Sequence, residues 1–151
     1  MSPEAQDVCR KLDVVNVKGS AVPMPIYTYD CHQTQNFPVL RTPKGSNMPL
    51  IKALEQKAKE FTTQTWTTDE DLVQLRHLAT REFRIIFEKG LDKYSSGEWK
   101  EAKRFFEQAS RMMSEGDNGN DGPSETLLQY MMNRNWKPPR DWIGCRPLTT
   151  K

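Results

Sequence analysis

The chain has 151 residues, of which 36% are hydrophobic and 28% charged, and its formal net charge is +2. The hydrophobic share is below the value of about 45–50% that is usual in globular proteins, which predicts a modest core. The balanced charge excludes a nucleic-acid-coating protein and a polybasic membrane anchor. The three cysteines, Cys9, Cys31 and Cys145, are widely spaced, and the sequence has neither a long apolar run nor a signal-peptide core. These features predict a cytoplasmic protein with free thiols and no membrane insertion.

Residues 1–30 predict a short helix followed by two strands. Ser2 and Pro3 form a typical helix start, and the apolar spacing extends this helix to about Lys11. Residues 14–18 are rich in β-branched side chains and residues 24–29 alternate between two faces, so both segments are predicted to be strands. A two-stranded hairpin alone is marginal in water, so we expect these strands to need a larger sheet, which this sequence does not contain.

Residues 31–67 are predicted to form an extended linker or arm. Its first half is polar and has no periodicity. Residues 49–61 carry one apolar stripe and form a possible short helix, whereas the Thr-rich segment 62–68 is poorly suited to a helix. Cys31 and His32 are metal-ligand types, but no second pair follows at ligand spacing, so we expect no metal.

Three amphipathic helices are predicted after this arm. The first spans about residues 69–93, unless it is broken near Thr80, and the second spans residues 98–113. Gly97 can adopt the positive φ that ends a helix between them. The third runs from about residue 123 to residue 135, where a Pro pair stops it.

The apolar faces of these helices predict a bundle that acts by contact, because no residue on them can serve as acid, base or nucleophile. Gly90 and Ala102 are small where their neighbours are large, so two helix axes are expected to approach closely there. The pattern resembles a single tetratricopeptide-type unit, which needs a third helix to cap it. The predicted core and interaction residues are Phe83, Phe87, Gly90, Tyr94, Gly97, Trp99, Ala102, Phe106 and Trp142.

Residues 136–142 interleave aromatic and cationic side chains, a composition that suits single-stranded nucleic acid. The cations are few and stand beside Asp141, and two prolines fix the local shape. We therefore expect this segment to fold back onto the helices, with Trp142 sealing the end of the bundle, and we expect no nucleic-acid partner.

The segment SPEAQDVCRKLDVVNVKGSAVPMPIYTYD resembles the closing segment of class III adenylate and guanylate cyclase catalytic domains. That family segment has a short helix ending in Arg, a strand, a Lys-Gly-Ser turn and a last strand of the type Pro-x-x-Ile-Tyr-Thr-Tyr-Asp. The matching residues are Cys9, Arg10, Asp13, Val15, Val17, Lys18, Gly19, Ser20, Pro23, Met24, Ile26, Tyr27, Thr28, Tyr29 and Asp30.

A second block resembles the tail that follows the catalytic domain in many bacterial and protist cyclases. It consists of GLDKYSSGEWKEAKRFFEQASRM, then DGPSETLL, then PPRDWIGCRPLTTK. The two blocks stand in the family's order and cover about two thirds of the chain. Residues 31–66 take no part in the resemblance.

The resemblance implies no catalytic, cofactor-binding or metal-binding residue in this chain. In the family, the metal-binding aspartates, the purine-selecting residues and the transition-state Asn and Arg all precede the matching segment. Lys18 has the chemistry to contact a phosphate beside a Gly turn, but the resemblance places it in the turn of the last hairpin. The residues of this hairpin that carry the family motif are Lys18, Gly19, Ser20, Tyr27 and Asp30.

The predicted fold is mainly α with a small β-hairpin. It divides into a cyclase-like helix and hairpin (residues 1–30), the arm (31–67) and a helical bundle with a C-terminal cap (68–151). In isolation, we expect the part from about Asp69 onward to be stable and the first third to be mobile or to aggregate.

Two functions stay open. The first is a non-catalytic C-terminal region of a nucleotidyl cyclase that acts as a regulatory or docking module. The second is a stand-alone structural or scaffold subunit within a larger assembly, for example a ciliary or organellar one. Both imply a protein partner and no cyclase activity from this chain alone.

Overall fold

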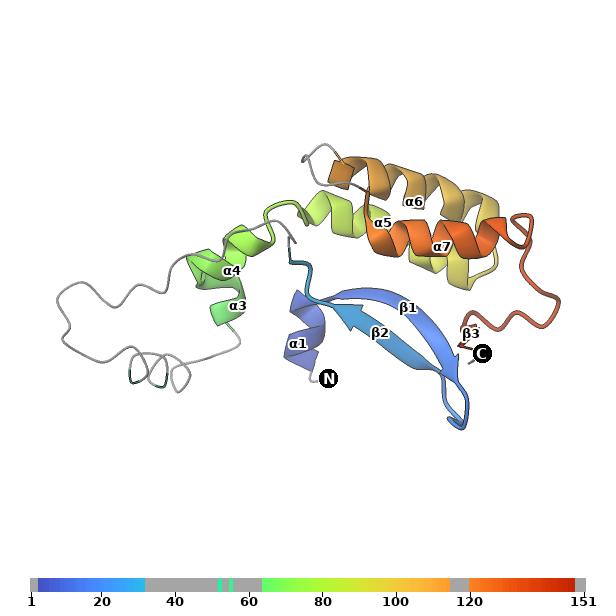
Figure 1. The fold of residues 1–151 in the computed structure, drawn as a ribbon, viewed down its shortest axis with the longest axis horizontal. Helices are drawn as coiled ribbons and strands as arrows, with labels where there is room; N and C mark the ends of the chain where they lie inside the picture. Colours follow the sequence, from blue (N-terminus) through green and yellow to red (C-terminus); the bar gives the residue numbers. More distant parts are fainter. Residues whose placement is uncertain (1–2, 32–51, 53–54, 56–63, 115–119, 149–151) are drawn as a thin grey trace.

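The computed structural model describes residues 3–31, 52, 55, 64–114 and 120–148, and these residues form six helices and a three-stranded sheet. The fold is therefore mixed, mainly helical with one small sheet (Figure 1). The predicted helix at residues 49–61 lies almost entirely outside the described residues.

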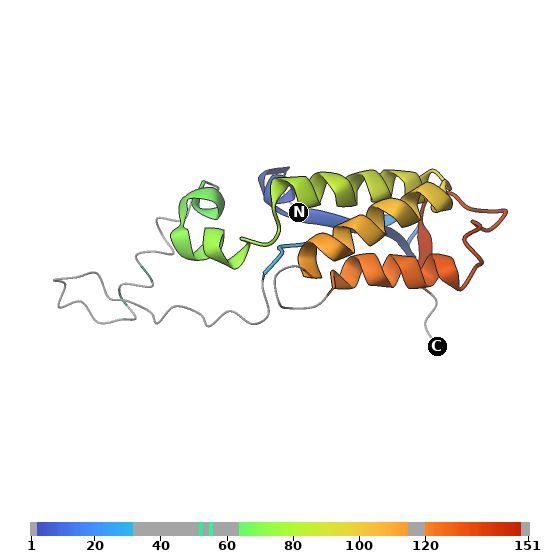
Figure 2. The ribbon, with the colours of Figure 1, turned by 90° about the horizontal axis from the view of Figure 1, so that it is seen from above.

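The helices α5 (Arg81–Ser95), α6 (Trp99–Ser114) and α7 (Gly122–Met132) pack together, with α6 on the side away from the sheet (Figure 1). Seen from above, α6 crosses between α5 and α7, and the strands pass beneath the three helices (Figure 2). The core consists of apolar side chains from all three helices, and the central aromatic residues Phe83, Phe87, Tyr94, Trp99 and Phe106 are at most 1% exposed. The sequence periodicity predicted α6, α7 and the end of α5 to within a few residues of their observed bounds.

The first predicted helix after the arm is broken. Helix α4 (Glu70–Leu75) ends early, and α5 begins at Arg81 after a short irregular link. Thr80 is the N-cap of α5, because its side chain accepts a hydrogen bond from the Phe83 N–H at 3.2 Å. The break near Thr80, left open by the sequence, is thus present.

Two other expectations from the sequence are wrong. Helix α1 (Pro3–Val8) ends three residues early, and strand β1 (Arg10–Val17) begins almost directly after it. The Thr-rich segment that was expected to avoid helix forms the short helix α3 (Thr65–Thr68). The hydroxyls of Thr67 and Thr68 donate to the Gln64 carbonyl at 2.9 and 3.0 Å, so these side chains reinforce the helical turn.

The sheet is larger than expected, because the C-terminal segment supplies its third strand. Strands β1 and β2 (Met24–Thr28) pair antiparallel with a bulge between Lys11 and Asp13. Strand β3 (Arg146–Leu148) then pairs in parallel with the end of β1, giving the order β2-β1-β3. The expectation that the chain contains no further strand for its hairpin was therefore wrong.

The sheet also packs against the bundle. Val15 of β1 is 1% exposed, and Leu12 packs against the bundle core. Residues that precede the arm and residues that follow it therefore share one packed unit, in which β1 lies along the layer formed by α5 and α7 (Figures 1 and 2).

Candidate functional site

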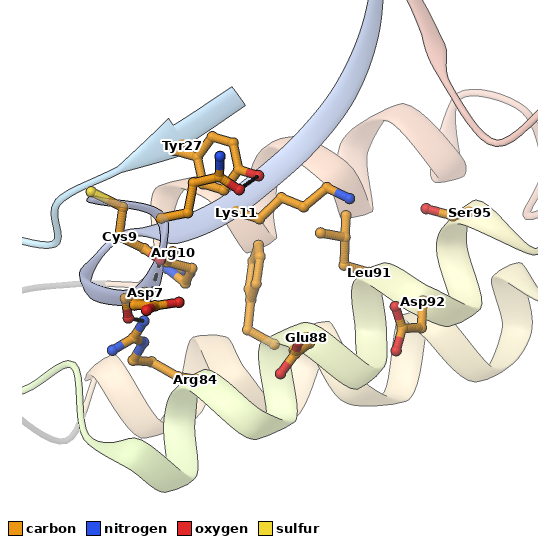
Figure 3. Close-up of a pocket in the computed structure, with 12 residues that line it drawn as sticks. Asp7, Cys9, Arg10, Lys11, Tyr27, Arg84, Glu88, Leu91, Asp92 and Ser95 are labelled. Carbon is orange, nitrogen blue, oxygen red and sulfur yellow. Dashed lines mark hydrogen bonds between the residues drawn. The ribbon is translucent and has the colours of Figure 1, made fainter. Parts of the chain in front are cut away.

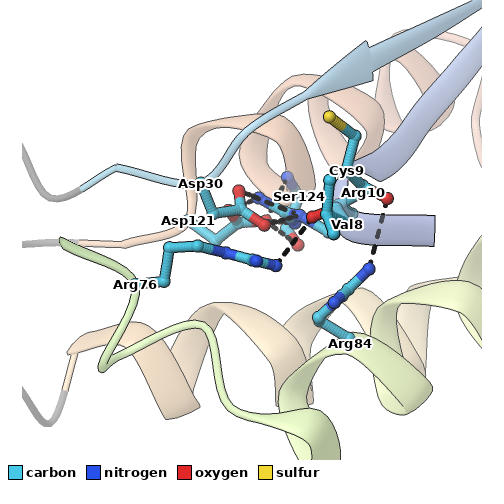
Figure 4. Close-up of polar contacts among 8 residues, drawn as sticks. All are labelled: Val8, Cys9, Arg10, Asp30, Arg76, Arg84, Asp121 and Ser124. Atoms are coloured by element: carbon cyan, nitrogen blue, oxygen red, sulfur yellow. Dashed lines mark hydrogen bonds and ion pairs between the residues drawn. The ribbon is translucent and has the colours of Figure 1, made fainter. Parts of the chain in front are cut away.

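The junction between sheet and bundle is organised by Arg10, the first residue of β1. This side chain is only 5% exposed, and its guanidinium lies between two carboxylates. It donates to Asp30 at 2.7 to 3.1 Å and to Asp121 at 2.8 and 3.0 Å. We call these three residues the Arg10 network (Figure 4).

The aromatic core of α5 completes the surroundings of Arg10. Its guanidinium carbon lies 4.7 Å from the ring centre of Phe83 and 4.3 Å from that of Phe87. Burial alone would lower the Arg10 pKa, but the bonds to Asp121 and Asp30 outweigh burial and raise it above its ordinary value. Arg10 therefore stays charged, and the two carboxylates and two rings hold it in one position.

Asp121 links this network to the start of α7. It is the N-cap of the helix and accepts from the Ser124 N–H at 2.9 Å and from the Ser124 hydroxyl at 2.6 Å. The Asp121 carboxylate thus caps the N-terminus of α7 and also forms an ion pair with the buried Arg10. The Asp-Gly-Pro-Ser start of the tail block and the Arg of the hairpin block, which the sequence presents as separate motifs, meet at this point.

A second ion pair joins the two blocks near the middle of β1. Arg146 of β3 donates to Asp13 at 2.9 Å, and Asp13 also accepts from the Val14 N–H at 2.8 Å. Burial raises the Asp13 pKa, and Arg146 opposes this shift without cancelling it. The ion pair thus adds a side-chain contact to the backbone pairing of the three-residue strand β3 with β1.

Three of the predicted core residues, Tyr94, Trp99 and Trp142, come together at the opposite end of the bundle. Tyr94 and Trp99 stack with ring centres 5.8 Å apart, and the Trp142 ring lies edge-on against both. The indole of Trp142 is half-buried and donates to the Ser95 carbonyl at 3.0 Å, which fixes the C-terminal segment over the turn.

Two glycines of the predicted set have specific steric roles. A Cβ on Gly90 would lie 2.9 Å from the Phe106 ring, so the absence of a side chain permits the close approach of α5 and α6. Gly97 has a φ of +84° and lies in the turn between these helices, near Pro138 and Trp142. Ala102 and Phe106 are fully buried.

The hairpin residues of the family motif do not gather into one site. Lys18 is exposed at the turn, Gly19 has a φ of +89°, and the Ser20 hydroxyl donates to the Val22 carbonyl at 2.8 Å. The Tyr27 hydroxyl donates to Gln6 at 3.2 Å, and only Asp30 belongs to the Arg10 network. These contacts assign turn and packing roles to the hairpin.

A groove of about 400 Å³ lies between α5 and the N-terminal helix and hairpin (Figure 3). Phe87 and Leu91 of α5 contribute apolar side chains to its lining, and Tyr27 lines it from β2. Its remaining walls carry both signs of charge, from Asp7, Lys11, Arg84, Glu88 and Asp92. The groove therefore lacks the concentrated positive charge that the binding of a nucleoside triphosphate requires.

The described part of the chain offers neither a metal-ligand cluster nor a membrane-spanning helix. Within it, no group of three or more His, Cys, Asp or Glu side chains is placed to hold a metal ion. No described helix has the length and apolar character needed to cross a bilayer.

Comparisons with known proteins found no match among protein-family models, curated proteins or solved structures. The residues themselves are therefore the basis for any statement about function.

The sequence alone missed the roles of Asp121 and Arg146 as partners of Arg10 and Asp13. Neither pair was detectable from the sequence, because Arg10 fell in the predicted first helix and Asp13 fell between that helix and the predicted strand at 14–18. The partners lie 111 and 133 positions away, so no local pattern could identify them.

Proposed function

We propose that this chain is a non-catalytic C-terminal region of the class III nucleotidyl cyclase type, which docks on or regulates a catalytic domain. One observation carries this proposal. The two blocks that resemble the family, separated by the arm, contact each other through Arg10 with Asp121 and through Asp13 with Arg146. Motif residues placed so far apart form buried ion pairs, as expected if the blocks are parts of one functional unit.

The docking surface in this proposal is the outer edge of β2. In the order β2-β1-β3, strand β2 has one strand neighbour among the described residues. Met24 at its start is 51% exposed and Val22 before it is 70% exposed. An edge strand with exposed apolar side chains can pair with a strand of a partner.

The helical part acts in this proposal as a tetratricopeptide-like contact module that braces the hairpin. The close approach at Gly90 and the buried Trp99 and Phe106 fit the small and large positions of such a unit. Its partner is a protein, located in the cytoplasm or in a ciliary or other complex.

The test uses a class III cyclase catalytic domain truncated before its closing hairpin. We expect the purified chain to form no cyclic nucleotide alone, to bind the truncated domain and to raise its activity. Met24→Glu should weaken binding about tenfold or more, which corresponds to about 1.4 kcal/mol. Met132→Glu is the matched control, because Met132 is 47% exposed on α7, away from the β2 edge. Cyclic nucleotide production by the chain alone, or equal effects of the two changes, would contradict the proposal.

The second candidate is a stand-alone scaffold subunit, which the same exposed edge favours. It predicts that a native complex contains the chain without any cyclase catalytic domain. Mass measurement of the chain and its companions, purified from source cells, separates the two functions.

A further inference from the structure

Two arginines beside the Arg10 network hold the end of α1 by its backbone. Arg84 Nη2 donates to the Asp7 and Cys9 carbonyls, both at 3.2 Å, and Arg76 Nη2 donates to the Val8 carbonyl at 2.7 Å. The two side chains reach this point from different segments, Arg76 from the link after α4 and Arg84 from α5 (Figure 4). Both side chains are half-buried.

Neither Arg76 nor Arg84 has a direct counter-ion in the described part of the chain. Arg10 engages both carboxylates of its network, Asp30 and Asp121. No carboxylate of the described residues forms an ion pair with Arg76 or Arg84, and Glu88, one turn after Arg84, is exposed. Asp7 and Glu88 line the groove beside Arg84 without forming an ion pair with it, and the backbone carbonyls that Arg76 and Arg84 contact are neutral. These two guanidiniums therefore converge on consecutive carbonyls of one helix end with no direct counter-ion among the described residues.

Arg76 also has a hydrogen-bond donor without an acceptor. The Nε–H of Arg76 is buried and has no acceptor, although the guanidinium lies 4.6 Å from the centre of the Tyr29 ring. A buried donor without an acceptor is rare and points to a missing partner. Burial and the neighbouring Arg76 lower the Arg84 pKa, which is the direction expected where a negative charge is lacking.

We propose that Arg76 and Arg84 form a binding site for one oxyanion, a carboxylate or a phosphate group. Guanidiniums present paired N–H donors that match the oxygens of such groups, and one bound anion would supply the direct counter-ion that both arginines lack. The site stands on these contacts alone and does not depend on the cyclase resemblance or on the β2 edge.

The test observes the arginine Nε–H signals of the isolated, full-length chain by NMR. Acetate and inorganic phosphate are titrated separately against chloride at constant ionic strength. We expect saturable shifts of the Arg76 and Arg84 signals, and the anion that saturates at the lower concentration identifies the source as carboxylate or phosphate. Arg134, whose guanidinium lies over Tyr130 in the C-terminal part of the bundle, is the internal control and should show no saturable shift.

Two variants make the test specific. Arg84→Gln should weaken the response of Arg76 at least fivefold while near-UV circular dichroism stays native. If Arg84→Gln does not fold, Arg76→Gln with Arg84 as the reporter answers the same question. Shifts that stay linear, that match those in chloride, or that appear equally at Arg134 would overturn the proposal.

Discussion

Arg10 and Asp121 lie 111 positions apart in the chain, yet two hydrogen bonds of 2.8 and 3.0 Å join their side chains in the protein interior. Through this contact, the first residue of β1 is fixed to the N-cap of α7. Hairpin and bundle are therefore coupled by charge as well as by apolar packing.

Loss of Arg10 should destabilise the whole chain. Arg10→Met leaves Asp30 and Asp121 buried without their cation, and removing one partner of a buried pair costs about 3–5 kcal/mol. Chemical denaturation should show this loss in the free energy of unfolding. Arg104→Met is the control, because that side chain is 76% exposed and its change should stay within about 0.5 kcal/mol. Equal midpoints for the two variants would show that the Arg10 network contributes little.

The sequence predicted the bundle better than the junction, for physical reasons. The helices α5, α6 and α7 follow from local periodicity and from local signals such as the Asp121 N-cap and Gly97. Strand β3 has no local signal, since it is short, contains Pro147 and depends on the distant Asp13. Helix α3 was missed because threonine side chains bonded to the backbone outweighed weak intrinsic propensity.

A side chain at Gly90 should force the first two bundle helices apart. An added Cβ would lie 2.9 Å from the Phe106 ring, so Gly90→Ala should lower stability by about 1–3 kcal/mol. Gly122→Ala is the matched change, since nothing lies within 4 Å of its added Cβ. Replacing that glycine should be neutral or stabilise by up to about 1 kcal/mol. Thermal unfolding of both variants decides this, and a neutral Gly90→Ala would refute the close approach.

Trp99→Ala should remove the largest buried side chain of the aromatic group. Large-to-small changes of a buried aromatic residue cost about 3–5 kcal/mol, so the bundle should unfold or melt far lower. Met132→Ala provides the comparison at an exposed position of α7. An unchanged melting curve for Trp99→Ala would exclude it from the core.

The Asp13–Arg146 pair predicts a pH-dependent effect. The Asp13 pKa is raised in the folded state, mainly by burial, so this group favours folding when protonated. Its contribution is lost as pH rises from the unfolded value of about 3.9 through the higher folded value. Arg146→Gln removes a cation that lowers the folded-state pKa of Asp13. The variant should therefore lose more folding stability than the parent chain as pH rises. The stability deficit of the variant should be small at acid pH and grow toward neutral pH, as measured by urea unfolding across this range. A deficit that does not change with pH would show that Arg146 acts through packing alone.

Native-state hydrogen exchange of the isolated chain tests most directly whether hairpin and bundle form one unit. We expect the amides of β1 and of α7 to exchange with the same opening free energy, and both to lose protection in Arg10→Met. Rapid exchange of β1 while α5, α6 and α7 stay protected would contradict this coupling and show that the hairpin needs a partner to fold.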